Sequence, residues 1–241
     1  MPKMSIMLLV MLVLSQPAFG QAPSGKRPPS VASAHTIDSE ALGKTVPFHV
    51  YLPPSYDSND ARRYPVIYWL HGTNGNSARG GAMIGGLLDR LMKAGRMPEA
   101  IVAFPDGLKT SMWVDSADGA VPMERFIVDE FVPMIDAQYR TVATAKGRMI
   151  EGGSMGGYGS ARLGLKYPDI FGAVSMLSAG PLQPVLDPEN APIVGRDHAT
   201  RMINEVYGGD LDYFSAQSPW HLATTLPDDQ RDDLRLRMIV G

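Results

Sequence analysis

Short, continuously apolar segments recur along the chain and alternate with longer segments of mixed polarity. A strand with one solvated face alternates between apolar and polar residues, whereas a strand buried on both faces of a parallel sheet is apolar throughout. The pattern therefore predicts buried, mostly parallel strands at residues 66–70, 100–104, 148–152, 173–177 and 236–240. A β-rich segment at 46–52 precedes them, and residues 34–38 could pair with it through a turn at 42–44.

Three of the intervening segments have helical spacing: residues 85–94, 123–139 and 156–167. In the second, apolar side chains recur at four-residue intervals, which places them on one helical face: Ile127, Phe131, Ile135 and Tyr139. Pro133 lies inside this segment and predicts a bend or a break there, because proline lacks a backbone donor. The alternation of strands and helices predicts a three-layer α/β sandwich with a mostly parallel central sheet. Residues 181–213 break the rhythm and are predicted to be an insertion over one sheet edge.

The first residues have the pattern of an export signal. Lys3 is followed by an apolar run at 4–14, and Ala18-Phe19-Gly20 offers small residues for cleavage. A membrane anchor is the alternative, but this run is about half of the roughly 20 apolar residues that a span needs. We therefore expect a signal peptide at 1–20, a disordered Pro/Ser/Gly-rich linker at 21–33 and one domain at 34–241. This organisation predicts a secreted or periplasmic protein without a membrane span.

Composition narrows the range of functions. The net charge is −3, from 22 basic and 25 acidic residues, and no basic block is present, so we expect no nucleic-acid partner. The 241 residues include no cysteine, which excludes thiolate catalysis and cysteine-ligated metals. The acidic run at 228–234 is interpreted as a solvated loop and helix start, not as a metal site. We expect neither a metal nor an organic cofactor.

One serine lies in a glycine-rich frame, Gly152-Gly153-Ser154-Met155-Gly156, between a predicted strand and a predicted helix. This sequence fits G-x-S-x-G, in which a serine on a sharp, strained strand-to-helix turn stands clear of the sheet. The start of the following helix favours negative charge nearby. A glycine-rich turn with an incidental serine is one alternative. A phosphate-binding loop is another, but no lysine follows the glycines. We interpret Ser154 as a catalytic nucleophile.

A serine hydrolase also needs donors for the oxyanion. One is expected to be the backbone N–H of Met155, directly after the nucleophile. The other is expected from the loop after the strand at 66–70, which begins with His71 and Gly72. We assign Thr73 N–H as this second donor, with Asn74 as the alternative. His71 is interpreted as a residue that orients the loop and faces the substrate, not as the base.

Five blocks of the sequence, in order, carry a family resemblance: "VYLPPSYD", "YPVIYWLHGTNGN", "AIVAFPDG", "ERFIVDEFVPMIDAQYR" and "GGSMGGYGSARLGLKYPDIFGAVSMLSAG". From about residue 36 onward the chain resembles the esterase family of α/β-hydrolases, which includes feruloyl, acetyl-xylan and enterochelin esterases and mycolyltransferases. The resemblance implies an α/β-hydrolase fold, Ser154 as nucleophile, and Thr73 and Met155 as oxyanion donors. It also places Trp113 where relatives bind substrate; a packing aromatic is the alternative for Trp113.

The resemblance raises one difficulty. In such enzymes the acid and then the histidine follow the serine along the chain. The acid comes after the strand that corresponds to "LRLRMIVG", so the resemblance implies that this sequence stops before its acid and lacks the last strand and helix. None of the internal histidines is favoured as a substitute base: His35, His49, His71, His198 and His221.

The leading hypothesis is an exported serine esterase whose complete form acts through an acyl-enzyme on a small-molecule or polysaccharide ester. An acyltransferase on the same fold is a second possibility. A non-catalytic exported binding protein that kept the fold and lost the triad is a third. The sequence does not identify the ester.

Overall fold

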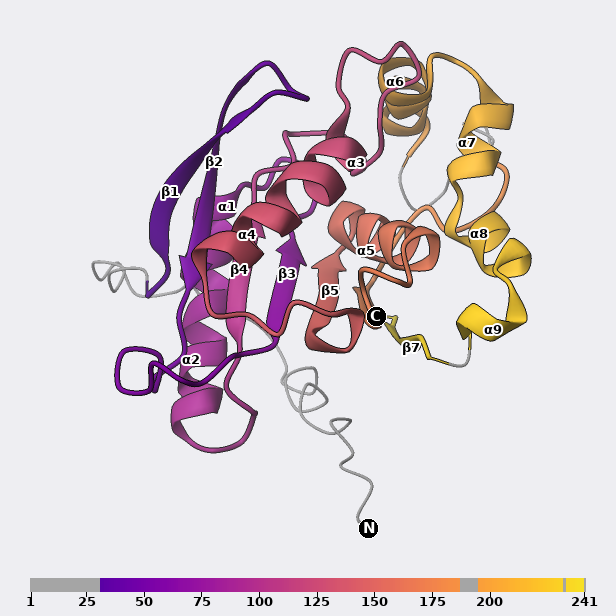
Figure 1. Ribbon diagram of the computed structural model, residues 1–241. Coiled ribbons are helices and arrows are strands. Elements are labelled where there is room, and N and C mark those ends of the chain that lie inside the picture. The colour runs from indigo at the N-terminus through magenta and orange to yellow at the C-terminus, as the bar shows by residue number, and fades with distance from the viewer. Residues whose placement is uncertain (1–30, 187–194, 232, 241) are drawn as a thin grey trace, which may run out of the picture.

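A seven-stranded sheet forms the centre of the molecule in the computed structural model, which describes residues 31–186, 195–231 and 233–240 (Figure 1). Its spatial order is β1-β2-β4-β3-β5-β6-β7. The strands are β1 Ser33–Ser39, β2 Lys44–Tyr51, β3 Val66–Leu70, β4 Ile101–Pro105, β5 Arg148–Gly153, β6 Ala173–Leu177 and β7 Arg235–Ile239. β1 and β2 are antiparallel to each other, and β2 is antiparallel to β4, whereas β4, β3, β5, β6 and β7 are parallel. The predicted mostly parallel α/β sandwich is confirmed.

The apolar runs become strands because helices cover both faces of the sheet. In β3, Val66, Tyr68 and Leu70 face the larger core, and Ile67 faces a second core on the other side of the sheet. β4 lies beside β3 and is buried along its whole length. A strand in this position cannot show polar alternation, because neither face meets water.

Two groups of helices form the outer layers (Figure 1). α1 Ser77–Gly80, the π-helical turn η1 Gly81–Gly85 and α2 Gly86–Lys93 lie behind the sheet, where Leu88 and Met92 enter the second core. The near face carries α3 Met123–Arg125, η2 Phe126–Phe131, α4 Val132–Gln138 and α5 Met155–Lys166. A short 3-10 turn, η3 Ala145–Gly147, precedes β5.

The predicted helix at 123–139 is divided, as Pro133 suggested, but the division begins earlier than expected. Residues 126–131 form a π-helical turn, and α4 starts only after it. Pro133 lies in the first turn of α4, where a missing backbone donor is tolerated.

The predicted insertion contains helices that its sequence did not indicate. α6 Arg196–Tyr207 and α7 Leu211–Gln217 follow one another along one side of the molecule, and α8 Pro219–Thr225 and α9 Asp228–Arg231 continue on that side (Figure 1). Gly208, with φ 65°, ends α6, and the Asp210 side chain caps α7 by accepting from the backbone N–H groups of Asp212 and Tyr213. α8, which follows the predicted insertion, packs against α5, the helix that follows Ser154.

The described domain has a buried residue near its start and a partly exposed strand at its end. The predicted signal peptide and most of the predicted linker lie outside the described residues. Of the linker predicted at 21–33, the structure describes residues 31–33: Ala32 is buried and Ser33 begins β1. At the other end, Leu236 and Met238 on β7 are about half exposed. No helix in the described ranges is long and apolar enough to cross a membrane.

Candidate active site

Ser154 lies at the join between β5 and α5 and is exposed to solvent. Its φ of 55° and ψ of −120° fall in a region that L-residues other than glycine rarely adopt. Two backbone bonds hold this conformation: Ser154 N–H donates to Leu177 O at 2.9 Å, and Tyr158 N–H donates to Ser154 O at 2.9 Å. The strained, outward-facing turn predicted from the sequence is therefore present.

Glycines allow the strand and the helix to pass close enough for this turn. A Cβ atom on Gly156 would lie 2.0 Å from the carbonyl oxygen of Leu70, at the end of β3. A Cβ atom on Gly152 would lie 2.5 Å from the carbonyl carbon of Gly156. Because these neighbours are backbone atoms of the central sheet and of α5, they cannot move aside as a flexible side chain would.

The loop after β3 faces the serine. A Cβ atom on Gly72 would lie 3.5 Å from Ser154 Cβ and 4.0 Å from Ser154 Oγ, so a side chain as small as alanine at this position would already contact Ser154. Asn74 N–H donates to Lys109 O at 2.9 Å, which removes it as an oxyanion donor. Met155 is the first residue of α5, and the N–H groups of a first helical turn have no partner within the helix. This geometry favours Thr73 over Asn74 as the second donor, although the pairing of Thr73 and Met155 stays a prediction.

His71 is held at both ring nitrogens. Gly107 N–H can only donate, so Nε2 of His71 accepts this bond at 2.9 Å, and the proton is therefore on Nδ1, which donates to Gly72 O at 2.9 Å. His71 is 3% exposed, and burial lowers its pKa below the ordinary value. A neutral, doubly bonded imidazole suits the loop-orienting interpretation of His71. Its burial disfavours the predicted contact with substrate.

Trp113 is fully buried, which favours the packing alternative over a place in the substrate pocket. Its indole Nε1–H donates to His71 O at 3.2 Å, and its ring lies edge-on to the His71 ring with 5.1 Å between centroids. Cβ atoms on Gly107 and Gly159 would lie 2.3 Å and 2.5 Å from Trp113 atoms. Trp113 therefore packs against the start of the loop after β3 and holds it through His71 O.

The other described histidines are placed elsewhere. His35 on β1 bonds Ser33 Oγ through Nε2 at 2.7 Å, and His49 on β2 bonds Ser77 Oγ through Nδ1 at 3.2 Å. His198 is half-buried on α6, and His221 is exposed on α8. Within residues 31–186, 195–231 and 233–240, no histidine hydrogen-bonds the Ser154 hydroxyl, and the assignment of the base stays a prediction.

A small pocket opens beside the predicted oxyanion donor, between the loops after β3 and β4 and one face of α6. Sequence reasoning missed the helical residues of this pocket, although their spacing of three and four residues was a usable signal. The pocket is lined by Thr73, Thr110, Met112, His198, Arg201, Met202 and Glu205. The floor is apolar, since Met112 and Met202 are buried, and the rim carries charged and hydroxyl groups.

Known proteins share much of this sequence. Residues 39–241 match the Esterase family, described as "Putative esterase". An endo-1,4-beta-xylanase/feruloyl esterase of Xylanibacter ruminicola is 33% identical over 165 residues, which cover 64% of this chain and 22% of that protein. Esterase Rv1288 of Mycobacterium tuberculosis is 32% identical over 144 residues, covering 58% of this chain and 30% of that protein. The chain thus spans less than a third of the length of these curated relatives.

Solved structures share the fold. A ferulic acid esterase superposes with a TM-score of 0.60 at 25% identity, covering 87% of this chain and 89% of that one. An S-formylglutathione hydrolase from Agrobacterium tumefaciens superposes with a TM-score of 0.64 at 16% identity, covering 90% of this chain and 89% of that one. The family match extends over most of the chain, and the parallel sheet with its serine turn agrees with it. The chain belongs to the Esterase family of α/β-hydrolases.

Proposed function

We propose that this chain is the catalytic domain of an exported serine carboxylic-ester hydrolase. The observation that carries the proposal is the exposed, strained Ser154 beside a backbone loop that approaches its hydroxyl. Strain of this kind persists only where surrounding structure enforces it, and it concentrates at functional sites. The feruloyl esterase and esterase names of the relatives support the reaction class.

The proposed reaction has two halves. Ser154 Oγ attacks the ester carbonyl carbon while a general base takes the hydroxyl proton, and the carbonyl oxygen becomes an oxyanion bound by Met155 N–H and Thr73 N–H. Collapse of this intermediate breaks the bond to the alcohol, which leaves with the proton from the base. Water then attacks the acyl-enzyme in the same way and releases the acid and Ser154.

The general base is the component that the described histidines do not supply. In the family the acid and the histidine come after the strand that corresponds to β7. β7 is parallel to β5 and separated from it by β6 alone. Because the carboxyl ends of parallel strands meet at one edge of a sheet, residues that follow β7 would emerge at the same edge as Ser154. This topology supports an acid and a histidine that are supplied by segments that follow β7 in the family.

The pocket beside Thr73 suggests where part of the substrate lies. An apolar floor with a rim of hydroxyl, cationic and anionic groups suits a substituent that has both an apolar body and hydroxyl groups. Small and carbohydrate-linked esters are therefore the proposed substrates, as the name of the Xylanibacter relative also suggests.

A panel of esters tests the proposal. The full-length protein is expected to hydrolyse p-nitrophenyl acetate and at least one of methyl ferulate and acetylated xylan, whereas Ser154→Ala is expected to lose this activity and remain folded. Equal activity of the two proteins would reject the serine mechanism. For export, the secreted protein is expected to begin at Gln21, and a mature protein that retains residues 1–20 would contradict the predicted signal.

A further inference from the structure

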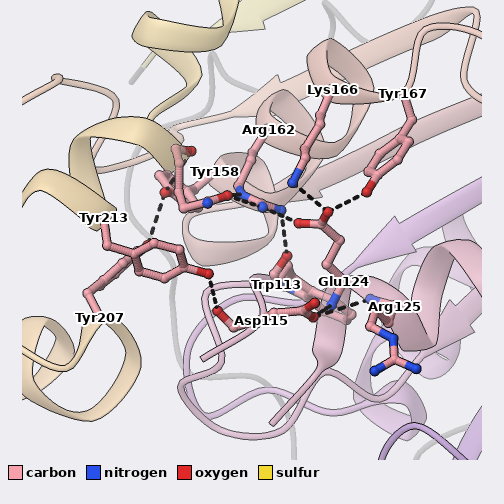
Figure 2. A network of polar contacts seen from close by, with 11 residues as sticks. Trp113, Asp115, Glu124, Arg125, Tyr158, Arg162, Lys166, Tyr167, Tyr207 and Tyr213 are labelled. Carbon is pink, nitrogen blue, oxygen red and sulfur yellow. Dashed lines mark hydrogen bonds and ion pairs between the residues drawn. The ribbon is translucent and has the colours of Figure 1, made fainter. Parts of the chain in front are cut away.

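A buried arginine lies in the middle of α5 and contacts the backbone of Trp113 (Figure 2). Arg162 is 1% exposed. Its guanidinium donates in three directions: from Nε to Gln217 Oε1 at 3.0 Å, from one terminal nitrogen to Trp113 O at 3.4 Å, and from the other to the Glu124 carboxylate. These three bonds start from three separate nitrogens of one rigid plane, whereas the three donors of a lysine ammonium all lie on a single nitrogen, so lysine cannot reproduce this geometry.

The charge of Arg162 is balanced by Glu124 of α3. Besides Arg162, the Glu124 carboxylate accepts from Lys166 Nζ at 2.7 Å and from the Tyr167 hydroxyl. Burial alone would raise the pKa of Glu124, but Arg162, Lys166 and Tyr167 together outweigh it and lower that pKa. Buried ion pairs can often be replaced by apolar residues without loss of stability. Fold stability therefore gives no sufficient reason for this pair, and a geometric role is the better explanation.

The segment that Arg162 holds is strained. Leu108, Met112 and Trp113 have φ values of 60°, 54° and 57°, although none of them is glycine. Side chains of this kind disfavour the left-handed region, so surrounding contacts must impose it. The Arg162 bond to Trp113 O is one such contact. The Trp113 ring is packed against Gly107 and Gly159, so the side chain cannot shift to relieve the backbone strain.

From Trp113 the contacts continue to the loop that faces Ser154. The indole N–H holds His71 O, and the His71 ring holds Gly72 O and Gly107 N–H. On its other side, Arg162 holds Gln217, the last residue of α7. The Tyr213 hydroxyl of α7 also donates to Asp115 O at 2.8 Å, two residues after Trp113 (Figure 2). One continuous set of bonds thus joins α7, α5 and the loop after β3.

We propose that Arg162 is a positioning residue that sets the oxyanion loop at residues 71–75 through Trp113 and His71. The proposal rests on the esterase function proposed above. Arg162 touches neither the substrate nor Ser154 in this scheme. Its guanidinium fixes the Trp113 carbonyl, the indole then fixes His71 O, and the imidazole fixes Gly72, next to Thr73. The bonds to Gln217 and Asp115 make the seating of α7 part of the same arrangement.

The test compares Arg162→Lys, which keeps the charge beside Glu124, with Trp113→Phe, which keeps a ring but removes the indole donor. Arg125→Lys is the matched control, because Arg125 is an exposed arginine of α3 whose side chain points away from the cluster in Figure 2. In the full-length protein with p-nitrophenyl acetate, we expect each of the first two variants to lower kcat about 10- to 100-fold with KM changed less than about twofold. The double variant is expected to be no slower than the slower single variant, because both act on one path.

Backbone hydrogen exchange supplies a readout that needs no turnover. The peptide that contains residues 71–75 is expected to exchange faster in Arg162→Lys and Trp113→Phe than in the parent and in Arg125→Lys. Should kcat and loop exchange stay unchanged while the melting temperature falls, Arg162 is only a structural residue and the proposal is wrong. Multiplying rate losses in the double variant would also overturn it. If the parent hydrolyses no ester, the esterase proposal fails on its own, and loop exchange still decides whether Arg162 positions the loop.

Discussion

Gly156→Ala tests the geometry that brings Ser154 to the oxyanion loop. The added methyl carbon would start 2.0 Å from Leu70 O, 2.6 Å from Leu70 C and 2.9 Å from His71 O, whereas real Cβ contacts essentially never fall under 3.0 Å. α5 must therefore move by about an ångström from the end of β3. Gly153→Ala is the matched control, because its nearest neighbour would be Leu177 O at 3.8 Å, an ordinary contact.

The expected cost follows from the atoms that must move. Overpacking a core costs about 1–3 kcal/mol, and occasionally more. Alanine returns about 1 kcal/mol of helix propensity at this position. Since the obstructing atoms belong to the backbone of a central strand, we expect a gross cost at or just above the top of that range, about 3–4 kcal/mol, and therefore a net loss of about 2–3 kcal/mol in the free energy of unfolding. An ångström of displacement between Met155 N–H and Thr73 N–H is expected to lower kcat/KM about 100-fold.

Urea unfolding followed by circular dichroism, with the m-value checked for constancy, measures the first quantity, and p-nitrophenyl acetate hydrolysis by the full-length protein measures the second. Gly153→Ala is expected to stay within about 0.5 kcal/mol and twofold of the parent. If Gly156→Ala is as stable and as active as Gly153→Ala, the close approach of β3 and α5 does not hold and the reasoning fails.

Three further predictions concern other parts of the domain. Burial lowers the pKa of His71, so the folded state disfavours the protonated imidazole. The free energy of unfolding should therefore fall as the pH drops from about 6.5 towards the lower pKa of the folded state. In His71→Gln, urea unfolding at a series of pH values should show a smaller decrease of this free energy over the same range. Burial raises the pKa of Glu151, whose carboxylate is held by Arg237 at 2.8 Å. Arg237→Met should therefore lose about 1–3 kcal/mol at neutral pH and less near pH 4, where Glu151 is protonated; an equal loss at both values would contradict this. Arg201→Ala should raise KM about three- to tenfold for esters of bulky or hydroxylated groups and leave KM for p-nitrophenyl acetate unchanged. Equal effects on both kinds of ester would show that the pocket lined by Arg201 does not bind the substrate.

Local patterns were sufficient for the sheet and for the serine turn. The apolar runs at 66–70 and 173–177 are β3 and β6 with the predicted bounds. A strand that is buried on both faces is apolar throughout, so it can be recognised from its residues alone. The frame around Ser154 was equally readable, since only glycine fits where β3 and α5 nearly touch.

Features that depend on distant segments were not predictable in the same way. The sequence of α6 is polar overall and lies near prolines and glycines, so it does not predict a helix by itself. Its apolar face becomes buried only when α7 and the loop after β4 pack against it. No local pattern distinguishes Arg162 from other charged helix residues, because its partners Gln217 and Glu124 are far away in the sequence. Trp113 was weighed evenly between pocket and packing, and only its complete burial distinguishes the two.

Active-site labelling tests the central claim most directly. The full-length protein is treated with an alkyl fluorophosphonate, digested with trypsin and sequenced by tandem mass spectrometry. The peptide at 149–162 contains Ser154 and Ser160, and Ser160 is an internal control, because it is buried and its hydroxyl donates to Gly156 O at 2.7 Å. The account predicts one phosphonyl adduct, on Ser154. Folded protein that carries no adduct, or an adduct on a different serine, would contradict it.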